Sequence, residues 1–223
     1  MIYFIKAYKG GLLMQLGAFS GAIYTFCNWF YRLAFINLLW LISTLLGLVL
    51  FGFFPATVAM LATIRQFIKK NEVNTLSTFW NYYKKEFVES NKVGAIIVIV
   101  GFILYVNINF LQVNHTDISQ FFYVSSIILL CLYFLIICYI LASYVEFDQD
   151  IKTHIKNAIL IALYNPLASL FMIFGFAAVY YAVTFISGLG IFFSASILGL
   201  VILSSANIAY RKVERKKDKL GLS

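Results

Sequence analysis

Long runs of apolar residues without a single charged side chain dominate the pattern of this chain. The longest covers residues 157–210 and is followed by six Lys or Arg within residues 211–219. A bilayer core about 30 Å thick requires about 20 apolar residues per helix, so this run holds two helices and a turn near residue 188. With the shorter runs, the pattern predicts five spanning helices, at about residues 33–54, 93–113, 119–144, 166–186 and 190–210.

Composition excludes an ordinary water-soluble domain. Hydrophobic residues make up 62% of the chain and charged residues only 12%, against about 25% charged in a typical soluble domain. The net charge of +8 does not indicate nucleic-acid binding, because the basic residues lie beside the apolar runs, where they face the membrane surface. The expected fold is all-α: residues 1–223 form one membrane domain, a polytopic helical bundle with cytoplasmic amphipathic helices.

The distribution of Lys and Arg predicts the orientation of the bundle. Basic residues gather in segment 55–92, around Lys152 and Lys156, and in the C-terminal tail. Connections rich in Lys and Arg stay on the cytoplasmic side. We therefore expect a multi-pass protein of the cell membrane with its C-terminus in the cytoplasm and its N-terminus outside, although Lys6, Lys9 and Arg32 argue against an external N-terminus.

The charge-free stretch 10–31 allows two interpretations. It can form a sixth span with the N-terminus inside, but Arg32 is followed at once by the next apolar run and leaves no room for a turn. It can instead extend the first span as one long helix. A cleavable signal peptide is not expected, because residues 10–17 form only a weak apolar region.

Two helical stretches are expected in the cytoplasmic segment 55–92, separated by the polar break 71–74. Pro55 suits a helix start. In the second stretch Phe79, Tyr83 and Phe87 repeat at helical spacing opposite lysines, which is typical of a helix in the headgroup region. This helix either packs under the bundle or serves as a docking surface. A further half-polar helix, 149–164, leads into the fourth span, where Asn165 suits the N-cap and Pro166 the first helical position.

One block of residues is specific enough to compare with known families: Arg32 to Trp40 followed by Gly47, Gly52, Pro55, Ala56 and Thr57. Further residues of the same comparison are Phe79, Trp80, Tyr83, Lys84, Phe87, Asn91, Gly94, Lys156, Asn157, Ala158, Asn165 and Pro166. Together they cover nearly the whole chain from about residue 18 and resemble the YesL family of bacterial membrane proteins. The resemblance implies a small polytopic protein, often encoded near sugar ABC transporters and polysaccharide-degrading enzymes in Gram-positive bacteria. It implies no catalytic residues.

Side chains that could support catalysis or bind a metal are few. His115 and His154 are expected on opposite sides of the membrane, and His154 can form a helical ion pair with Asp150. Cys131 and Cys138 lie seven residues apart, a spacing that favours buried hydrophobes over metal ligands. We therefore expect no catalytic residues, no cofactor and no metal, and predict that the protein is not an enzyme.

Polar residues inside the predicted spans are uncharged. Asn37, Thr44 and Gly47 share one face of the first span, a pattern typical of contacts between helices. The absence of a deep carboxylate argues against a coupled transporter. We predict an accessory protein in contact with the lipid bilayer and with a membrane partner such as a sugar ABC transporter, and keep a small-solute facilitator as the alternative. Candidate packing or partner-contact residues are Arg32, Asn37, Trp40, Pro55, Phe79, Trp80, Tyr83, Phe87, Asn165 and Pro166.

Overall fold

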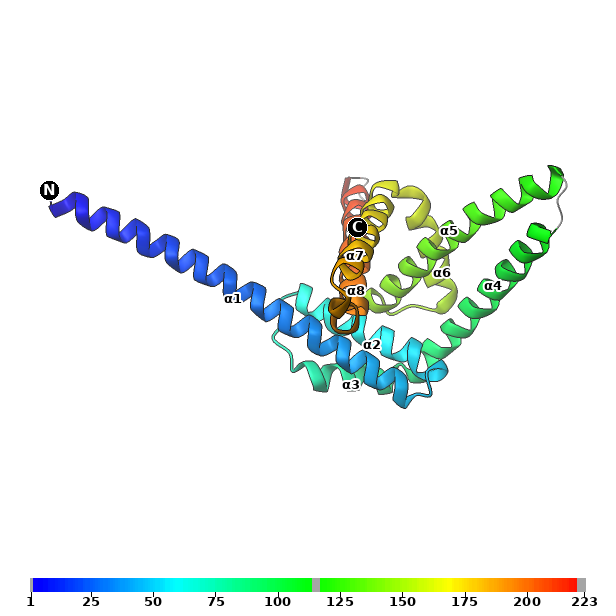
Figure 1. Cartoon of the computed structure of the whole chain (residues 1–223), viewed down its shortest axis with the longest axis horizontal. Helices are drawn as coiled ribbons and strands as arrows, with labels where there is room; N and C mark the ends of the chain where they lie inside the picture. Colours follow the sequence, from blue (N-terminus) through cyan, green and yellow to red (C-terminus); the bar gives the residue numbers. More distant parts are fainter. Residues whose placement is uncertain (1, 114–116, 220–223) are drawn as a thin grey trace.

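The structure is a computed structural model that describes residues 2–113 and 117–219. Within these ranges all regular secondary structure is helical, which confirms the expected all-α class (Figure 1). His115 lies outside the described residues. The eight helices of the described ranges are α1 (Ile2–Leu46), α2 (Leu50–Ile68), α3 (Thr75–Lys85), α4 (Phe87–Val113), α5 (Asp117–Glu146), α6 (Ile151–Tyr164), α7 (Pro166–Phe185) and α8 (Ser187–Lys219).

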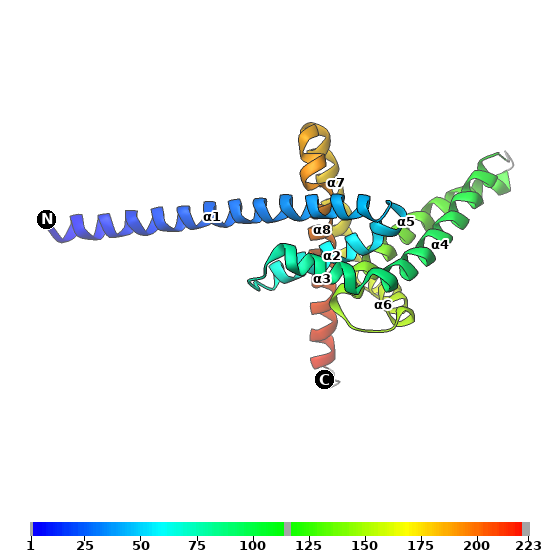
Figure 2. The same ribbon diagram turned by 90° about the horizontal axis from the view of Figure 1, so that it is seen from below.

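The N-terminal helix α1 is a single helix from Ile2 to Leu46. Its first half projects away from all other helices (Figures 1 and 2). Stretch 10–31 therefore extends the following apolar run as one long helix and does not form a separate span. No turn intervenes at Arg32, in agreement with the sequence argument.

The predicted first span, 33–54, is wrong in one respect: residues 47–49 form a turn that divides it into the end of α1 and the start of α2. Val49 has a φ of 64° and a ψ of −59°, and the Leu50 N–H donates to the Leu48 carbonyl at 2.7 Å. These values describe a γ-turn. Gly47 and Gly52 approach so closely that neither position has space for a Cβ, and this contact allows the sharp reversal. Pro55 consequently lies inside α2 and not at a helix start.

Helix α2 is the centre of the packing. It contacts α1, α3, α4, α5 and α8, and its small residues Ala56, Ala59 and Ala62 are buried against these neighbours. By length and composition α2 also qualifies as a membrane span, so the described residues contain six candidate spans where about five were expected. The additional candidate arises from the segment that had been predicted to begin the cytoplasmic region.

The remaining candidate spans form two hairpins, α4 with α5 and α7 with α8 (Figure 1). Helix α8 runs across α1 (Figure 2). It passes α1 at Phe193 and Ser196 and α2 at Gly199. Near the end of its apolar part, the Tyr210 ring lies 5.1 Å from that of Phe147, just beyond α5.

The polar breaks of the sequence are helix ends in the structure. Residues 71–74 separate α2 from α3, and α6 is a separate helix before α7, as predicted. Asn165 occupies the N-cap of α7 and Pro166 its first turn, but the Asn165 side chain does not cap the helix. Phe79 and Tyr83 on α3 are buried, which agrees with a helix that packs under the bundle.

Candidate functional site

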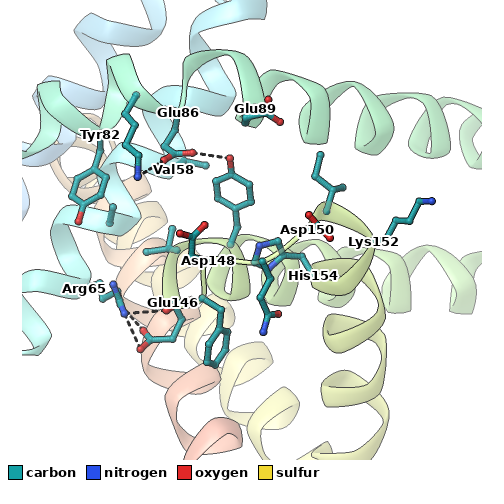
Figure 3. A pocket seen from close by; sticks show the side chains of 17 residues that line it. Val58, Arg65, Tyr82, Glu86, Glu89, Glu146, Asp148, Asp150, Lys152 and His154 are labelled. Carbon is teal, nitrogen blue, oxygen red and sulfur yellow. Dashed lines mark hydrogen bonds and ion pairs between the residues drawn. The ribbon is translucent and has the colours of Figure 1, made fainter.

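A cavity of about 670 Å³ lies where the C-terminal ends of α2 and α5 meet the start of α4 and of α6. Three separate stretches of the chain form its wall (Figure 3). Arg65 comes from α2, Glu86 and Glu89 from the α3–α4 junction, and Glu146 from the end of α5. The loop after α5 and the first turn of α6 complete it with Asp148, Gln149, Asp150, Lys152 and His154.

Carboxylates are concentrated in this cavity. The whole chain has nine Asp and Glu residues and a net charge of +8, yet five of its acids line this one cavity: Glu86, Glu89, Glu146, Asp148 and Asp150. Three cationic side chains accompany them, from Arg65, Lys85 and Lys152. The cavity is therefore an acidic region on a basic protein.

Glu146 is held by two cations, one in the last turn of α2 and one just after it. The Arg65 guanidinium donates from Nε to Oε2 at 2.6 Å and from Nη2 to Oε1 at 3.0 Å, and Nη2 also donates to the Glu146 backbone carbonyl at 3.1 Å. Lys69 donates to Oε1 at 2.9 Å. A forked guanidinium contact of this kind fixes geometry as well as charge, so it ties the end of α2 to the end of α5.

The two acids at the α3–α4 junction also have partners. Glu86 accepts a hydrogen bond from the Tyr144 hydroxyl at 2.8 Å and lies 3.4 Å from the Lys85 ammonium. Glu89 pairs with Lys92 at 2.6 Å on the surface of α4. The Tyr144 contact joins α5 to the α3–α4 junction. Figure 3 shows Glu86 at a different part of the wall from Arg65 and Glu146.

Asp148 and Asp150 differ from the other acids of the cavity. Both are exposed, and neither carboxylate takes part in a hydrogen bond or ion pair among the described residues. Asp150 stands at the N-cap of α6 without a side-chain cap bond, where the helix dipole favours a negative charge. These two carboxylates are available to a cationic group that enters the cavity.

His154 is buried at the inner wall, with 2% of its surface exposed. Its Nδ1 lies 2.9 Å from the Ser143 hydroxyl, and its ring lies 5.4 Å from that of Tyr144. The expected ion pair with Asp150 is not formed, because the His154 ring points into the packing between α5 and α6. Burial lowers the pKa of His154 and outweighs the Gln149 carbonyl and the Asp148 and Asp150 carboxylates, which favour the proton.

The cavity offers little catalytic chemistry. Ser143 and His154 have the separation of a nucleophile and its base, but Ser143 is fully buried and cannot meet a substrate. Among residues 2–113 and 117–219, no three His, Cys, Asp or Glu side chains converge closely enough to hold a metal ion. The arrangement is suited to binding a charged group.

None of the ten candidate residues from the sequence lines this cavity. Asn37 is fully buried and joins α1 to α8: its Nδ2 donates to the Ile191 carbonyl at 2.7 Å, and its Oδ1 accepts from the Ser196 N–H at 3.0 Å. Trp40 donates from Nε1 to the Thr57 hydroxyl at 3.1 Å. Both residues therefore form contacts between helices.

The other candidates pack around α2 and at helix ends. The Arg32 guanidinium lies 5.0 Å from the centre of the Phe67 ring, and the Tyr83 hydroxyl donates to the Ser43 carbonyl at 3.2 Å. Burial raises the pKa of Tyr83. Of the remaining six, Pro55, Phe79 and Asn165 are buried, Phe87 is partly buried, and Trp80 and Pro166 are exposed.

One signal in the sequence could have located the cavity. Its acids are five of only nine in the chain, and all five lie within seven residues of an end of the second or third predicted span. The prediction of orientation uses only the positions of Lys and Arg, so it does not reveal this grouping of Asp and Glu.

Comparison with known proteins shows relatives over almost the full length. The family described as "Protein of unknown function, DUF624" matches residues 33–108. Of the Bacillus subtilis (strain 168) proteins, "Uncharacterized protein YteU" is 32% identical over 198 residues, covering 87% of this chain and 88% of the relative. "Uncharacterized protein YesV" is 32% identical over 205 residues (91% and 98%), and "Uncharacterized protein YesL" is 28% identical over 209 residues (93% and 98%). No solved structure matches the chain significantly.

Proposed function

Because the chain belongs to the YesL-type family, for which the matched relatives carry no assigned activity, we propose from its own surfaces that it is a non-catalytic accessory protein of the membrane. In this proposal it binds a membrane partner that belongs to a carbohydrate uptake or sensing system. The link to carbohydrates depends on the gene neighbourhood that the family resemblance implies.

The observation that carries the proposal is the cavity between α2, α4, α5 and α6. It is open, it has about 670 Å³ of space, and its lining is charged, whereas Ser143, which lies beside His154 of the wall, is buried away from any substrate. A cavity with unpaired charged side chains, in which the Ser143 hydroxyl is inaccessible, is better suited to binding another molecule than to catalysing a reaction.

The position of the cavity also supports contact with a partner. It lies at the end of the bundle where Arg65, Lys69 and Lys85 are found, and the positive-inside rule places such an end in the cytoplasm. A cytoplasmic loop of a neighbouring membrane protein can reach this level without crossing the bilayer.

Co-purification from native membranes tests the proposal. The tagged full-length protein is extracted in mild detergent, and proteins enriched over a membrane control are quantified by mass spectrometry. We expect a membrane transport or sensing component to be enriched reproducibly. Recovery of the protein with no enriched partner, under several mild detergents, would contradict an accessory role.

A further inference from the structure

We propose that the acidic cavity is the docking site for a Lys- or Arg-bearing segment of the partner, such as a basic loop that follows one of its membrane spans. This inference rests on the proposed accessory function and names the chemistry by which the partner is recognised. Its physical basis is the charge that remains in the cavity after the internal contacts are counted.

Most charges of the wall are already paired within the protein. Arg65 and Lys69 both contact Glu146, and Lys85 lies beside Glu86. The mouth retains Asp148 and Asp150, which no described cation contacts, and one exposed ammonium, that of Lys152. Two unpaired carboxylates against one unpaired ammonium leave a negative charge at the mouth, and this charge favours an entering cation.

The shape and the aromatic lining suit a long cationic side chain. A volume of about 670 Å³ exceeds what one ion requires and lies within the range of about 300–1,000 Å³ that is usual for ligand sites. Tyr82, Tyr144 and Phe147 contribute rings to the wall. Such rings can pack against the methylene stem of Lys or Arg and attract its charged end.

Other occupants fit the cavity less well. Anionic lipid headgroups are repelled by Asp148 and Asp150, and the described acids and His154 do not converge as metal ligands. The protein's own basic residues 211–219 continue α8 as a helix (Figure 2) and do not turn back toward α6. By contrast, loops on the cytoplasmic side of membrane proteins are rich in Lys and Arg, so a partner brings the matching charge to the correct side of the bilayer.

A binding experiment with defined probes tests the site. Full-length protein in phosphatidylcholine nanodiscs is titrated against a fluorescent ten-residue peptide of alternating Arg and Ala, and against the same peptide with citrulline in place of Arg. We expect the Arg peptide to bind more tightly than the citrulline peptide. The double substitution Asp148→Asn with Asp150→Asn should weaken its binding about tenfold, since two exposed charge contacts are lost.

Two further variants complete the experiment: one is a matched control, and the other is expected to change the affinity in the opposite direction. Glu72→Gln removes an exposed acid in the α2–α3 loop, outside the cavity, and should leave the affinity unchanged. Lys152→Gln removes the free cation at the mouth and should raise the affinity. Equal affinity of the Arg peptide for wild type and the Asp148 and Asp150 double variant, or equal binding of the two peptides, would overturn the inference.

The two proposals fail in different ways. A partner that co-purifies equally with wild type and with the double Asn variant would retain the accessory role and reject the cavity as its docking site. Binding of the Arg peptide that requires Asp148 and Asp150, without any partner in native membranes, would support the site and contradict the accessory role. Lys152→Gln keeps the test decisive should the double variant fail to fold.

Discussion

The Arg65 guanidinium forms a two-pronged contact with the Glu146 carboxylate, at 2.6 and 3.0 Å, although the residues are 81 positions apart in the chain. Arg65 lies in the last turn of the buried helix α2, and Glu146 ends α5. Their side chains are only 22% and 27% exposed, so the contact is screened less than a surface ion pair. It therefore fixes one wall of the acidic cavity relative to the core.

Substitution of Arg65 is expected to destabilise the fold. Arg65→Ala removes two hydrogen bonds to a carboxylate and a third to the Glu146 carbonyl, and we expect a loss of about 1–3 kcal/mol in the free energy of unfolding. Arg65→Lys should retain only part of the stability that Arg65→Ala loses, because an ammonium cannot form the two-pronged contact with the carboxylate. Unfolding of the detergent-solubilised protein, followed by tryptophan fluorescence, measures both.

Lys69 provides the matched control for this prediction. It contacts the same carboxylate at 2.9 Å but is 45% exposed, so Lys69→Ala should cost less than about 1 kcal/mol. A loss from Lys69→Ala as large as that from Arg65→Ala would show that charge alone, and not the forked geometry, stabilises the junction.

Asn37 is expected to be the strongest single polar contact between α1 and α8. Its amide both donates to Ile191 and accepts from the Ser196 N–H, and it is fully buried. Asn37→Ala removes both hydrogen bonds between the helices in an apolar region, so we expect a loss of about 1–2 kcal/mol. Thermal unfolding in micelles provides the measurement.

Asn109→Ala is the corresponding control. Asn109 is also an Asn in an apolar helix, but it is exposed and its amide donates to the Tyr105 carbonyl of its own helix at 2.8 Å. Its removal should change stability by less than about 0.5 kcal/mol. Equal effects of the two substitutions would mean that Asn37 contributes no specific contact between helices.

The sequence predicted those features of the fold that have a local polar signal. The break at 71–74, the separate helix α6 and the start of α7 at Pro166 all coincide with Asn, Asp or Pro residues. The turn at 47–49 was missed because Leu48 and Val49 are apolar, and the close contact of Gly47 with Gly52 is visible only when both helices are in place. The charge-free run 33–54 was therefore predicted as one span, whereas in the structure it contains the end of α1 and the start of α2.

The acidic cavity could not be derived from any single segment. Arg65, Glu86 and Glu146 lie on different helices, and only the packing of α2 against α5 and α4 brings them together. The same holds for His154. Its neighbour four residues earlier, Asp150, suggested a helical ion pair, whereas burial against Ser143 on α5 determines its actual environment.

Gly94 is expected to be necessary for the contact between α2 and α4. A Cβ at this position would collide with the Phe54 ring. At an exposed helix position, Gly→Ala stabilises a protein by about 1 kcal/mol. At a closely packed position, the added methyl group instead destabilises it by about 1–3 kcal/mol. We expect Gly94→Ala to lower the melting temperature and the double variant Gly94→Ala with Phe54→Leu to recover part of the loss.

Gly188→Ala tests whether the collision, and not glycine itself, is responsible. A Cβ at Gly188 meets no atom within 4 Å, so this substitution should be neutral or slightly stabilising. A rise in melting temperature for Gly94→Ala would contradict the close approach of α2 and α4.

His154 is expected to make the stability of the protein depend on pH. Burial lowers its pKa in the folded protein below the ordinary value of 6.5. Between the lowered pKa and about 6.5 the unfolded chain binds more protons than the folded chain, so the free energy of unfolding rises with pH in that window. The contribution is complete above about pH 6.5 and is lost as the pH falls toward the folded pKa.

The comparison of wild type with His154→Gln isolates this contribution. Melting temperatures in micelles at pH 7.5 and pH 5 should differ more for wild type than for the variant, since Gln cannot take up the proton. His115, the other histidine of the chain, is present in both proteins, so its contribution to the pH dependence drops out of the comparison. An equal fall with pH in both proteins would assign the effect to the carboxylates of the cavity, and a smaller fall in wild type would mean that protonated His154 is stabilised by Asp148 and Asp150.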